Sequence, residues 1–589
     1  MIRLHLLLLF VFLTCGYAQA QVKIISGKTL DKADNSPLPG VSIMLKGSKK
    51  GVQSDSKGNF TLDIGSAASA TLVVNYVGYN TQQVEVGNKT QLDIYLVQAD
   101  NGLNEVVVVG YGTQKKVNLT GSVASISSAQ ITNRPVTSMQ NALQGITPGL
   151  TVKSRTGDVG SFNSTTGEGG AGGDIGSLSL RGSNQITLAG QTPVSKEPLI
   201  VVDGIPASPA DFARINPNDV ESISVLKDAA SASIYGNRAA NGVILVTTKK
   251  GKDGKMNIEY NGYYGQQSPT NIPKYLGSPQ YARLLNEALT NAGRPVRFTE
   301  EEIRKFDTGE DPDKYPNTDW YKASLLKNAP LQDHQISVSG GDKIKFYSGF
   351  GYMNQESLKK GKDMDRYSFR LNTNAAVNKR LNLSTTSSFT QEMYQMDGGD
   401  YSFTTLNRNV PTIPIRHTDG TWGSLSGGVF DPLVTGNTVR TLEEGGWSRS
   451  KEQRINTAVN ADLTLIEGLT LRGTASYNAY NKTGSAFTNE LAPIINFLTK
   501  QPVASTAVTP NALDERWDRN NRMLLQGTAE YEKTIGKHYG KILGGTSYEA
   551  FQSRFIRAGR KDFPNNDLGV IDAGANNPNF NTNEGNLGE

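Results

Sequence analysis

Residues 367–389 read Tyr-Ser-Phe-Arg-Leu-Asn-Thr-Asn-Ala-Ala-Val-Asn-Lys-Arg-Leu-Asn-Leu-Ser-Thr-Thr-Ser-Ser-Phe. Apolar residues share one parity from Tyr367 to Val377 and again from Leu381 to Phe389, while the other parity holds mainly Asn, Ser, Thr and Arg. Between the two runs, Asn-Lys-Arg at 378–380 has the composition of a tight turn. Alternation with a period of two predicts β-strands with one apolar and one polar face.

The same rhythm recurs from residue 258 onward, at 344–352, 455–465 and 469–477. Amphipathic segments of about ten residues with aromatics near their ends are typical of transmembrane β-barrels. Short and long connections also alternate, as expected when periplasmic turns are short and outside loops are long. A soluble β-sandwich or adhesin is the alternative. The tight links are expected at 341–342, 378–380 and 466–468, the long ones at roughly 268–330, 391–453 and 480–521, and a medium one at 354–365.

The pattern accounts for about nine strands, and the Asn- and Gly-rich tail at 576–589 resembles an unfinished loop. An open sheet would leave two unpaired edges, which lipid does not tolerate. We therefore expect this chain to be the N-terminal portion of a longer protein, with residues 256–589 forming part of a barrel.

The N-terminus carries a secretion signal. Arg3, the apolar run 4–13 and the small-x-small triplet at 18–20 predict a signal peptide over residues 1–20. The single cysteine, Cys15, lies inside it, and a lipoprotein signal is the alternative interpretation. Once the signal is removed, the mature protein has no thiol for a disulfide or a cysteine nucleophile.

Composition limits the function classes. The 589 residues are too many for one core, so several domains are expected. A net charge of only +5 gives no support to nucleic-acid binding. Mean hydropathy is −0.41, and after the signal no apolar run approaches the length of a membrane helix.

Residues 21–98 hold short β-runs separated by turn clusters, which predicts a small β-sandwich. The segments at 37–41, 58–60 and 76–79 resemble the carboxypeptidase regulatory-like domain, a non-catalytic module.

Residues 99–116 form a linker around Asn104–Gly112, Asn-Glu-Val-Val-Val-Val-Gly-Tyr-Gly. The four valines predict a short strand without an obvious partner nearby. Such a strand can add to the exposed sheet edge of another protein, where main-chain hydrogen bonds supply affinity. A buried strand of an adjacent domain is the alternative.

Residues 117–252 mix α and β signals. A short helix is expected at 138–143 and a helical turn at 229–235, closed by Gly236. Strands are expected at 198–202, 220–226 and 242–247.

Several motifs together resemble SusC/RagA-type TonB-dependent outer-membrane transporters. They are Glu105–Gly112, Asn118–Val123, Leu180–Ser183, Pro198–Pro206 and the long run Asn216–Ile244. The resemblance covers the whole chain in order. Two plug connections, 161–177 and 184–197, look longer than is usual in this family.

The resemblance implies a mainly β protein: a small β-sandwich, an α/β plug domain over 117–252 and a barrel of 22 strands, of which about nine are present here. It also implies import of oligosaccharides or, in some members, peptides, with a SusD-like surface lipoprotein and TonB as partners. The protein would lie in the outer membrane of a Gram-negative bacterium, in contact with its lipid. The implied TonB-binding residues are Glu105, Val106, Val107, Val108 and Val109, and the implied plug motifs include Arg181, Gly182, Asp203, Gly204, Tyr235 and Gly236.

No enzyme signature accompanies these motifs. The histidines of the mature chain, at 334, 417 and 538, lack metal-ligand spacing. The stretch 169–174 matches one start of a calcium-binding repeat but occurs once, and a loop is the preferred interpretation. We expect no catalytic residue, metal or cofactor. A non-transporting adhesion protein is the alternative function. The outside aromatics Trp320, Tyr321, Trp422 and Trp447 are expected to pack loops rather than to stack on sugars.

Overall fold

The computed structural model describes residues 23–588 except 33, 49, 66–69, 77, 78, 88, 98–105, 110, 111, 116–122, 133, 154–158, 160–176, 181–196, 424–436 and 537. The chain divides into two compact units, residues 1–107 with 112–120, and residues 108–111 with 121–589. The expected signal peptide, the stretch 169–174 and most of the two long plug connections lie outside the described residues.

The first unit contains a β-sandwich. One sheet has the order β4-β1-β7 and the other β3-β2-β5-β6. Alternate side chains of both sheets meet in one core, where Ile25 and Phe60 of one sheet join Ile43 and Leu72 of the other. The predicted sandwich is therefore confirmed. Its strands are β1 (Ile24–Asp31), β2 (Ser42–Leu45), β3 (Gly51–Gln53), β4 (Asn59–Asp63), β5 (Thr71–Asn75), β6 (Gln82–Glu85) and β7 (Ile94–Leu96).

The valine strand has a partner close by in the sequence. β8 (Val106–Val109) and β9 (Gly112–Lys115) form a two-stranded sheet. The expectation of a strand without a local partner was wrong. Only two residues separate the strands, a length suited to a hairpin. The strand β9 was missed because its sequence lacks apolar residues, but main-chain hydrogen bonds can pair strands of any composition.

The second unit contains a mixed α/β domain, which we call the plug, built on a sheet of order β10-β15-β16-β13-β14. Ile126, Ile223 and Ile244 of this sheet pack with Phe212 and Leu143 in one buried core. The predicted helix at 138–143 and the three predicted strands are present. The elements are β10 (Val123–Ser127), α2 (Ser128–Thr132), α3 (Met139–Ala142), β11 (Leu150–Lys153), β12 (Ser177–Leu180), β13 (Leu199–Val202), β14 (Ile205–Ala207), α4 (Pro209–Ala213), η2 (Pro217–Asp219), β15 (Val220–Leu226), α5 (Ala229–Ala232), η3 (Ser233–Ala239) and β16 (Val243–Thr248).

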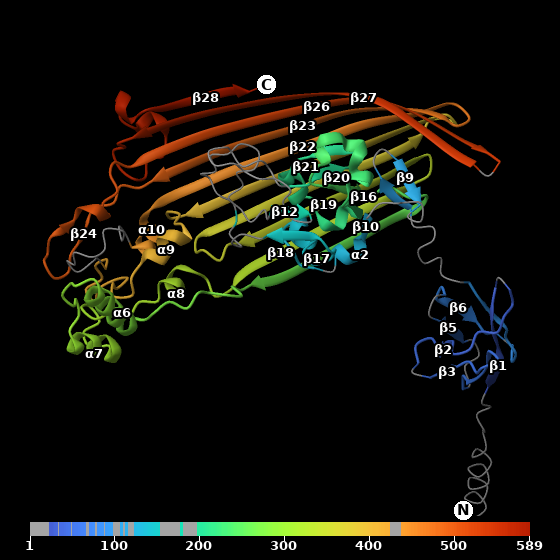
Figure 1. Ribbon diagram of the computed structural model, residues 1–589, viewed down its shortest axis with the longest axis horizontal. Helices are drawn as coiled ribbons and strands as arrows, with labels where there is room; N and C mark the ends of the chain where they lie inside the picture. Colours follow the sequence, from blue (N-terminus) through green and yellow to red (C-terminus); the bar gives the residue numbers. More distant parts are fainter. Residues whose placement is uncertain are drawn as a thin grey trace, which may run out of the picture. The chain divides into compact units, whose positions relative to one another are not determined.

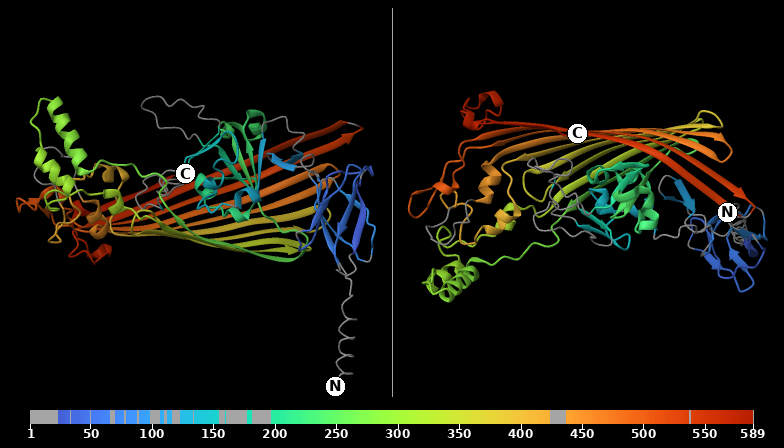
Figure 2. Two further views of the ribbon diagram at one scale, coloured as in Figure 1. Left: turned by 90° about the horizontal axis from the view of Figure 1, so that it is seen from below. Right: turned by 45° about the horizontal axis from the view of Figure 1, so that its top comes forward.

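The rest of the described second unit is dominated by one antiparallel sheet, which we call the wall (Figure 1). The sheet curves, and the plug lies on its concave face (Figure 2). Some strands reach 24 residues, so they extend past the roughly nine to eleven residues that cross a membrane. In order, the strands are β17 (Gly254–Gln267), β18 (Ala329–Gly341), β19 (Ile344–Glu356), β20 (Lys362–Ala376), β21 (Leu381–Asp397), β22 (Gly446–Ile466), β23 (Leu469–Thr488), β26 (Ala512–Ile535), β27 (His538–Lys561) and β28 (Thr582–Gly588).

The wall has ten strands among the described residues, against about nine expected. The additional one is β28, in the tail that the sequence suggested was a loop. Residues 582–588 pair with 553–559 of β27. The prediction failed because an Asn- and Gly-rich segment lacks apolar alternation, whereas pairing at a sheet edge needs only main-chain donors and acceptors.

The two faces of the wall differ as the alternation predicted. Apolar side chains such as Phe350, Val459 and Leu525 are exposed on the outward face. On the inward face Arg370, Glu392 and Arg454 are buried. The outward face is suited to lipid and the inward face to polar contacts.

At one end of the wall the connections are long, apart from the short link 357–361, and at the other end they are tight. Trp320, Tyr401, Leu406, Ile413 and Val439 share one small core between residues 268–328 and 398–445. The expectation that Trp320 packs loops is therefore confirmed. The connecting elements are α6 (Ser278–Asn291), α7 (Glu300–Thr308), α8 (Trp320–Ser324), α9 (Phe403–Arg408), α10 (Thr438–Glu444), β24 (Ile494–Ile495), β25 (Pro502–Val503), η4 (Ala504–Thr506), η5 (Ile571–Ala573) and η6 (Pro578–Phe580).

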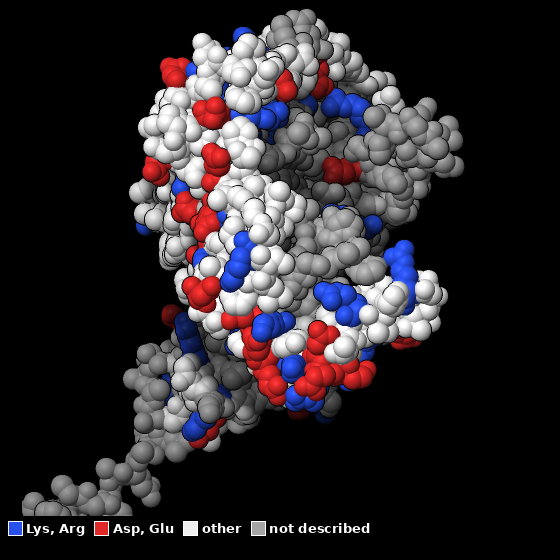
Figure 3. All heavy atoms as spheres, turned by 90° about the vertical axis from the view of Figure 1, so that its left-hand side faces the viewer, with Lys and Arg blue, Asp and Glu red and all other residues white. Residues whose placement is uncertain are grey.

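Figure 3 views this end of the molecule, where Lys, Arg, Asp and Glu side chains intermingle around a hollow. Several form exposed ion pairs, such as Arg304 with Glu301 and Glu310. Within the described residues no helix is both long enough and apolar enough to span a membrane.

Candidate functional site

The segment 208–219 of the plug faces the wall. Ser208 caps α4, because its hydroxyl accepts from the Asp211 amide and the Asp211 carboxylate accepts from Ser208 in return. Arg214 is the C-cap of the same helix. Asn216 then caps η2, which ends at Asp219. Two tight caps therefore place Asp211, Arg214 and Asp219 at fixed positions along one edge of the plug.

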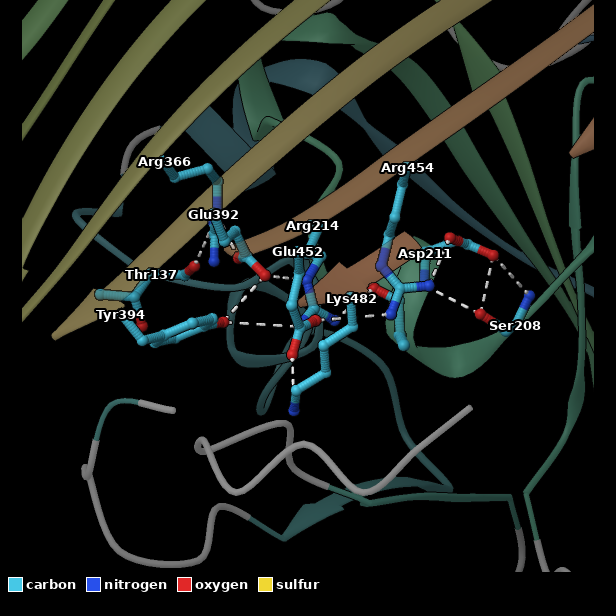
Figure 4. A network of polar contacts seen from close by, with 11 residues as sticks. Thr137, Ser208, Asp211, Arg214, Arg366, Glu392, Tyr394, Glu452, Arg454 and Lys482 are labelled. Carbon is cyan, nitrogen blue, oxygen red and sulfur yellow. Dashed lines mark hydrogen bonds and ion pairs between the residues drawn. The ribbon is translucent and has the colours of Figure 1, made fainter. Parts of the chain in front are cut away.

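Arg214 enters a cluster of charged side chains from four strands of the wall, β20, β21, β22 and β23 (Figure 4). Its Nε pairs with Glu392 of β21, and its Nη2 lies 3.2 Å from Glu452 Oε2 of β22. The side chains of Arg214 and Glu392 are 4% and 1% exposed. Because both charges are removed from water, each depends on the other for its stability.

Glu392 has two further partners, both of them in the wall. Arg366 Nε of β20 lies 2.8 Å from Glu392 Oε1, and Tyr394 donates a 2.8 Å hydrogen bond to Oε2. Arg366 also donates to the backbone carbonyl of Thr137 in the plug at 2.9 Å. Glu392 is therefore the centre of a group that binds the plug through both side-chain and main-chain contacts.

Glu452 extends the cluster along the wall. Lys482 Nζ of β23 lies 3.2 Å from Glu452 Oε1. Arg454, two residues further along β22, reaches Asp211 of the plug at 3.1 Å. Four cations thus face three carboxylates in this cluster among the described residues, which we call the charge cluster: Asp211, Arg214, Arg366, Glu392, Glu452, Arg454 and Lys482.

The plug residues of this cluster have shifted pKa values. Burial alone would raise the pKa of Asp211, but Arg454, Ser208 and Arg214 together lower it below its usual value of 3.8. Burial alone would lower the pKa of Arg214, but Glu392, Tyr394 and Glu452 raise it well above its usual value. Both groups are therefore held in their charged forms.

A second contact forms around Asp219. Arg370 Nε lies 3.2 Å from Asp219 Oδ2, Tyr347 donates to Oδ1 at 2.8 Å, and Gln335 donates to the same oxygen. The wall residue beneath it is Gly349, where a Cβ would lie 2.6 Å from Asp219 Oδ1. Glycine therefore permits the close approach of plug and wall at this point.

A cavity of about 60 Å³ lies between these contacts. Asp203, Asn216, Arg370 and Asn478 are among its polar lining residues. This volume suits a few water molecules, and the lining offers them donors and acceptors. The plug–wall interface is therefore polar as well as charged.

The described residues of the predicted plug motifs lie at a turn and at a kink of the plug backbone. Asp203 (φ 48°) and Gly204 (φ 88°) form the turn between β13 and β14. The Asp203 carboxylate accepts from the hydroxyl of Thr248 at 2.6 Å, and the Thr248 hydroxyl accepts from Asn372 of the wall at 2.8 Å. Asp203 therefore connects to the wall through one intermediate residue.

The other predicted residues are placed as follows. Gly236 (φ 64°) kinks η3, and Tyr235 packs partly against a satellite core of the plug. Nearby, Arg238 lies 2.7 Å from Glu549 of β27. Glu105, Arg181 and Gly182 lie outside the described residues, and Val106, Val107, Val108 and Val109 form β8. The described plug-motif residues, Asp203, Gly204, Tyr235 and Gly236, all belong to the second unit.

The charge cluster was not predicted from the sequence. The available signal was a set of charged residues at mid-strand on the polar parity of the wall, Arg366, Arg370, Glu392, Glu452 and Arg454. In the described part of the chain, no three His, Cys, Asp or Glu residues are grouped so as to hold a metal ion.

Comparisons with known proteins agree with this architecture. Residues 25–108 match the CarboxypepD_reg-like domain family, and residues 115–243 match the TonB-dependent receptor plug domain family. TonB-dependent receptor P26 of Formosa agariphila is 32% identical over 92% of this chain and 50% of its own length. TonB-dependent receptor SusC of Bacteroides thetaiotaomicron is 30% identical over 63% of this chain and 34% of its own length.

Among solved structures, a chain of the RagAB peptide importer in the open-open state matches with a TM-score of 0.64 and 26% identity. The match covers 82% of this chain and 53% of that one. The chain spans about half the length, or less, of the curated relatives that it matches over most of its sequence. The chain has the sandwich, the plug and the outward-apolar wall of this family, and its relatives are members of it. The chain therefore belongs to the SusC/RagA-type TonB-dependent transporters of the outer membrane.

Proposed function

We propose that the whole protein imports a nutrient oligomer across the outer membrane, using mechanical work delivered by TonB. The observation that carries the proposal is the buried charge cluster, in which Arg214 of the plug pairs with Glu392 and Glu452 of the wall. A plug held by charged and hydrated contacts can be displaced and returned, because water can solvate the separated groups. A plug held by a large buried apolar surface could not be released in this way, because water does not solvate apolar groups favourably.

The proposed point of attachment for TonB is Glu105–Val109. β8 belongs to a two-stranded sheet, so one of its edges lies outside that pairing. A strand of a partner can add to such an edge through main-chain hydrogen bonds. Force applied there would reach the plug through residues 116–122, which connect β9 to β10.

The proposed cargo is an oligosaccharide, with a peptide as the competing cargo, and the proposed partner is a SusD-like lipoprotein. Support for a sugar comes from the outer connections, where the exposed Tyr275 stacks at 5.0 Å between ring centroids on Tyr321, which itself packs against the loop core as expected. Tyr321 also donates to Asn407, so a flat ring lies beside hydrogen-bonding groups. Support for a peptide comes from the RagAB structure, which is that of a peptide importer.

Deletion of residues 105–109 tests the coupling role. We expect uptake of labelled substrate by whole cells to be lost, while substrate binding at the cell surface is retained. A matched deletion of residues 98–102, in the polar linker, should leave both intact. Uptake that survives the 105–109 deletion would reject the coupling role, and wild-type cells that bind the substrate without taking it up would indicate the adhesion alternative.

The cargo is tested separately. Purified full-length protein with its lipoprotein partner should bind an oligosaccharide fraction, measured by isothermal titration calorimetry, and should not bind a peptide fraction of similar mass. The opposite selectivity would replace the sugar with a peptide and leave the transport mechanism unchanged.

A further inference from the structure

The outward face of the wall carries three exposed basic side chains above its apolar region, in addition to Arg449, which pairs with Asp397. The three are Lys451 on β22, Arg519 on β26 and Arg554 on β27. In the strand register Arg519 is paired with Arg554, and Lys451 lies in the same row as Trp517, with Thr483 between them. We call these three residues the basic patch.

The direction of these side chains follows from their neighbours. On β27, Glu549 contacts Arg238 of the plug, so odd-numbered residues there face inward. On β26, Asn520 accepts from Ser553 of β27, which places Asn520 on the inward face as well. Arg519 and Arg554 have the opposite parity and therefore face outward.

The positive charges of Arg519 and Arg554 repel each other, because the two residues lie opposite one another on neighbouring strands. Registered partners on neighbouring antiparallel strands have Cα atoms about 4.5–5.5 Å apart, and like charges directly opposite are destabilising. Across the described residues neither arginine, nor Lys451, has an ion pair or a side-chain hydrogen bond. Glu515, the carboxylate nearest along β26 on this face, is four residues from Arg519 and accepts from Ser485.

Along the strands, the basic patch lies between the exposed apolar residues and the long connection. Toward the end of β26 at Ile535 the outward residues become apolar, with Met523, Leu525 and Tyr548 exposed. Toward the long connection at 489–511, Trp517 lies on the same face, 37% exposed. Tryptophan is enriched at the boundary between the apolar interior of a membrane and its headgroups. The basic patch therefore lies at headgroup level on the side of the long connections.

We propose that Lys451, Arg519 and Arg554 bind the phosphate group of a phosphorylated glycolipid in the outer leaflet of the outer membrane. Two adjacent guanidinium groups match the geometry of a phosphate, and clustered basic residues at a membrane surface recognise anionic headgroups. A bound phosphate would offset the repulsion between the two arginines. The proposal depends on the outer-membrane location and does not depend on the cargo or on TonB.

The test measures lipid binding by the full-length protein in detergent, using native mass spectrometry. The probes are lipid A carrying its phosphates and the same lipid after enzymatic dephosphorylation. We expect binding of the phosphorylated form only. The double variant R519Q/R554Q should weaken that binding at least about tenfold, because two charge-assisted contacts are lost. The charge-matched double variant R380Q/K533Q, exposed at the opposite end of the wall, should bind like the wild type.

The variant R519K/R554K keeps the charges but loses the guanidinium geometry, so its binding should lie between that of the wild type and that of R519Q/R554Q. Heat-modifiable gel mobility shows that each variant is folded. Equal binding by R519Q/R554Q and the wild type would overturn the proposal, as would equal binding of the two lipid forms. Displacement of the lipid by inorganic phosphate at millimolar concentration would assign the patch to a free anion and overturn the lipid assignment. Failure of any of these outcomes leaves the transport proposal untouched, because uptake is not measured.

Discussion

Arg214, at the end of a short plug helix, forms a buried ion pair with Glu392 on the inward face of the wall, 178 residues away in the sequence. Neither residue lies in a sequence motif that the family resemblance supplied. The pair shows that the plug is anchored by specific charges on adjacent wall strands, and its neighbours give a graded series of tests.

Arg214→Gln should weaken plug docking strongly. Removing one partner of a buried pair costs about 3–5 kcal/mol, and we expect the lower end because Glu392 keeps Arg366 and Glu452 keeps Lys482. The measurement is the urea concentration at which the plug becomes sensitive to trypsin. Arg238→Gln is the control, since its pair with Glu549 is half-exposed and should contribute only about 0–1 kcal/mol. Equal midpoints for the two variants would contradict the role of Arg214.

Tyr394→Phe should have a smaller effect at the same site. It removes one hydrogen bond to Glu392 and leaves both arginine partners in place, so we expect a loss of about 1–1.5 kcal/mol in plug docking. Tyr352→Phe makes the same chemical change on the outward face, where Tyr352 donates to Asp365 at 2.9 Å. That control should leave trypsin sensitivity of the plug unchanged. A larger effect of Tyr352→Phe would argue against the assignment of the two faces.

Gly236→Ala should destabilise the plug through its backbone. Gly236 has φ 64° and ψ −149°, a region occupied almost only by glycine, and an alanine there costs on the order of 1–3 kcal/mol. An added Cβ would meet no atom within 4 Å, so the cost is not steric contact with neighbours. Gly473→Ala, in the wall with equally open surroundings, is the control. The readout is hydrogen exchange of the plug amides, which should accelerate only in Gly236→Ala.

Acid should weaken plug docking through Asp211. The pKa of Asp211 is lowered in the folded protein from its usual 3.8, so its ionised form adds stability at neutral pH. That stability is present above pH 3.8 and is lost as the pH falls through the lowered value. We therefore expect wild-type docking to be stable from neutral pH down to about pH 5 and to weaken below pH 4. The difference between the wild type and Asp211→Asn should shrink over the same acid range; a constant difference would exclude this role.

The wall was predictable because its alternation is local. Phe369, Leu371 and Leu383 share a parity in the sequence, and the structure places that parity outward. The charge cluster was not predictable, because it joins residues such as Asp211 and Arg454 that are distant in the chain. Long-range pairing depends on the strand register, which one sequence does not specify.

Two local features were not predicted from the sequence. The connection expected at roughly 268–330 contains α6 and α7, and α7 begins at a capping box formed by Thr299 and Glu302. The partner of the valine strand was missed because β9 has few apolar residues. For β9, main-chain hydrogen bonding produced a strand where apolar periodicity was weak.

The shared core of the outer connections limits how this protein can be re-engineered. Trp320 of one connection donates its indole N–H to the Val410 carbonyl of the next at 2.9 Å, and the aromatic and aliphatic side chains around it come from both segments. A chimaera that receives only one of the two segments from a relative would contain only half of the side chains that form this core. Exchange of recognition properties between homologues should therefore succeed only when residues 268–328 and 398–445 are transplanted as one cassette.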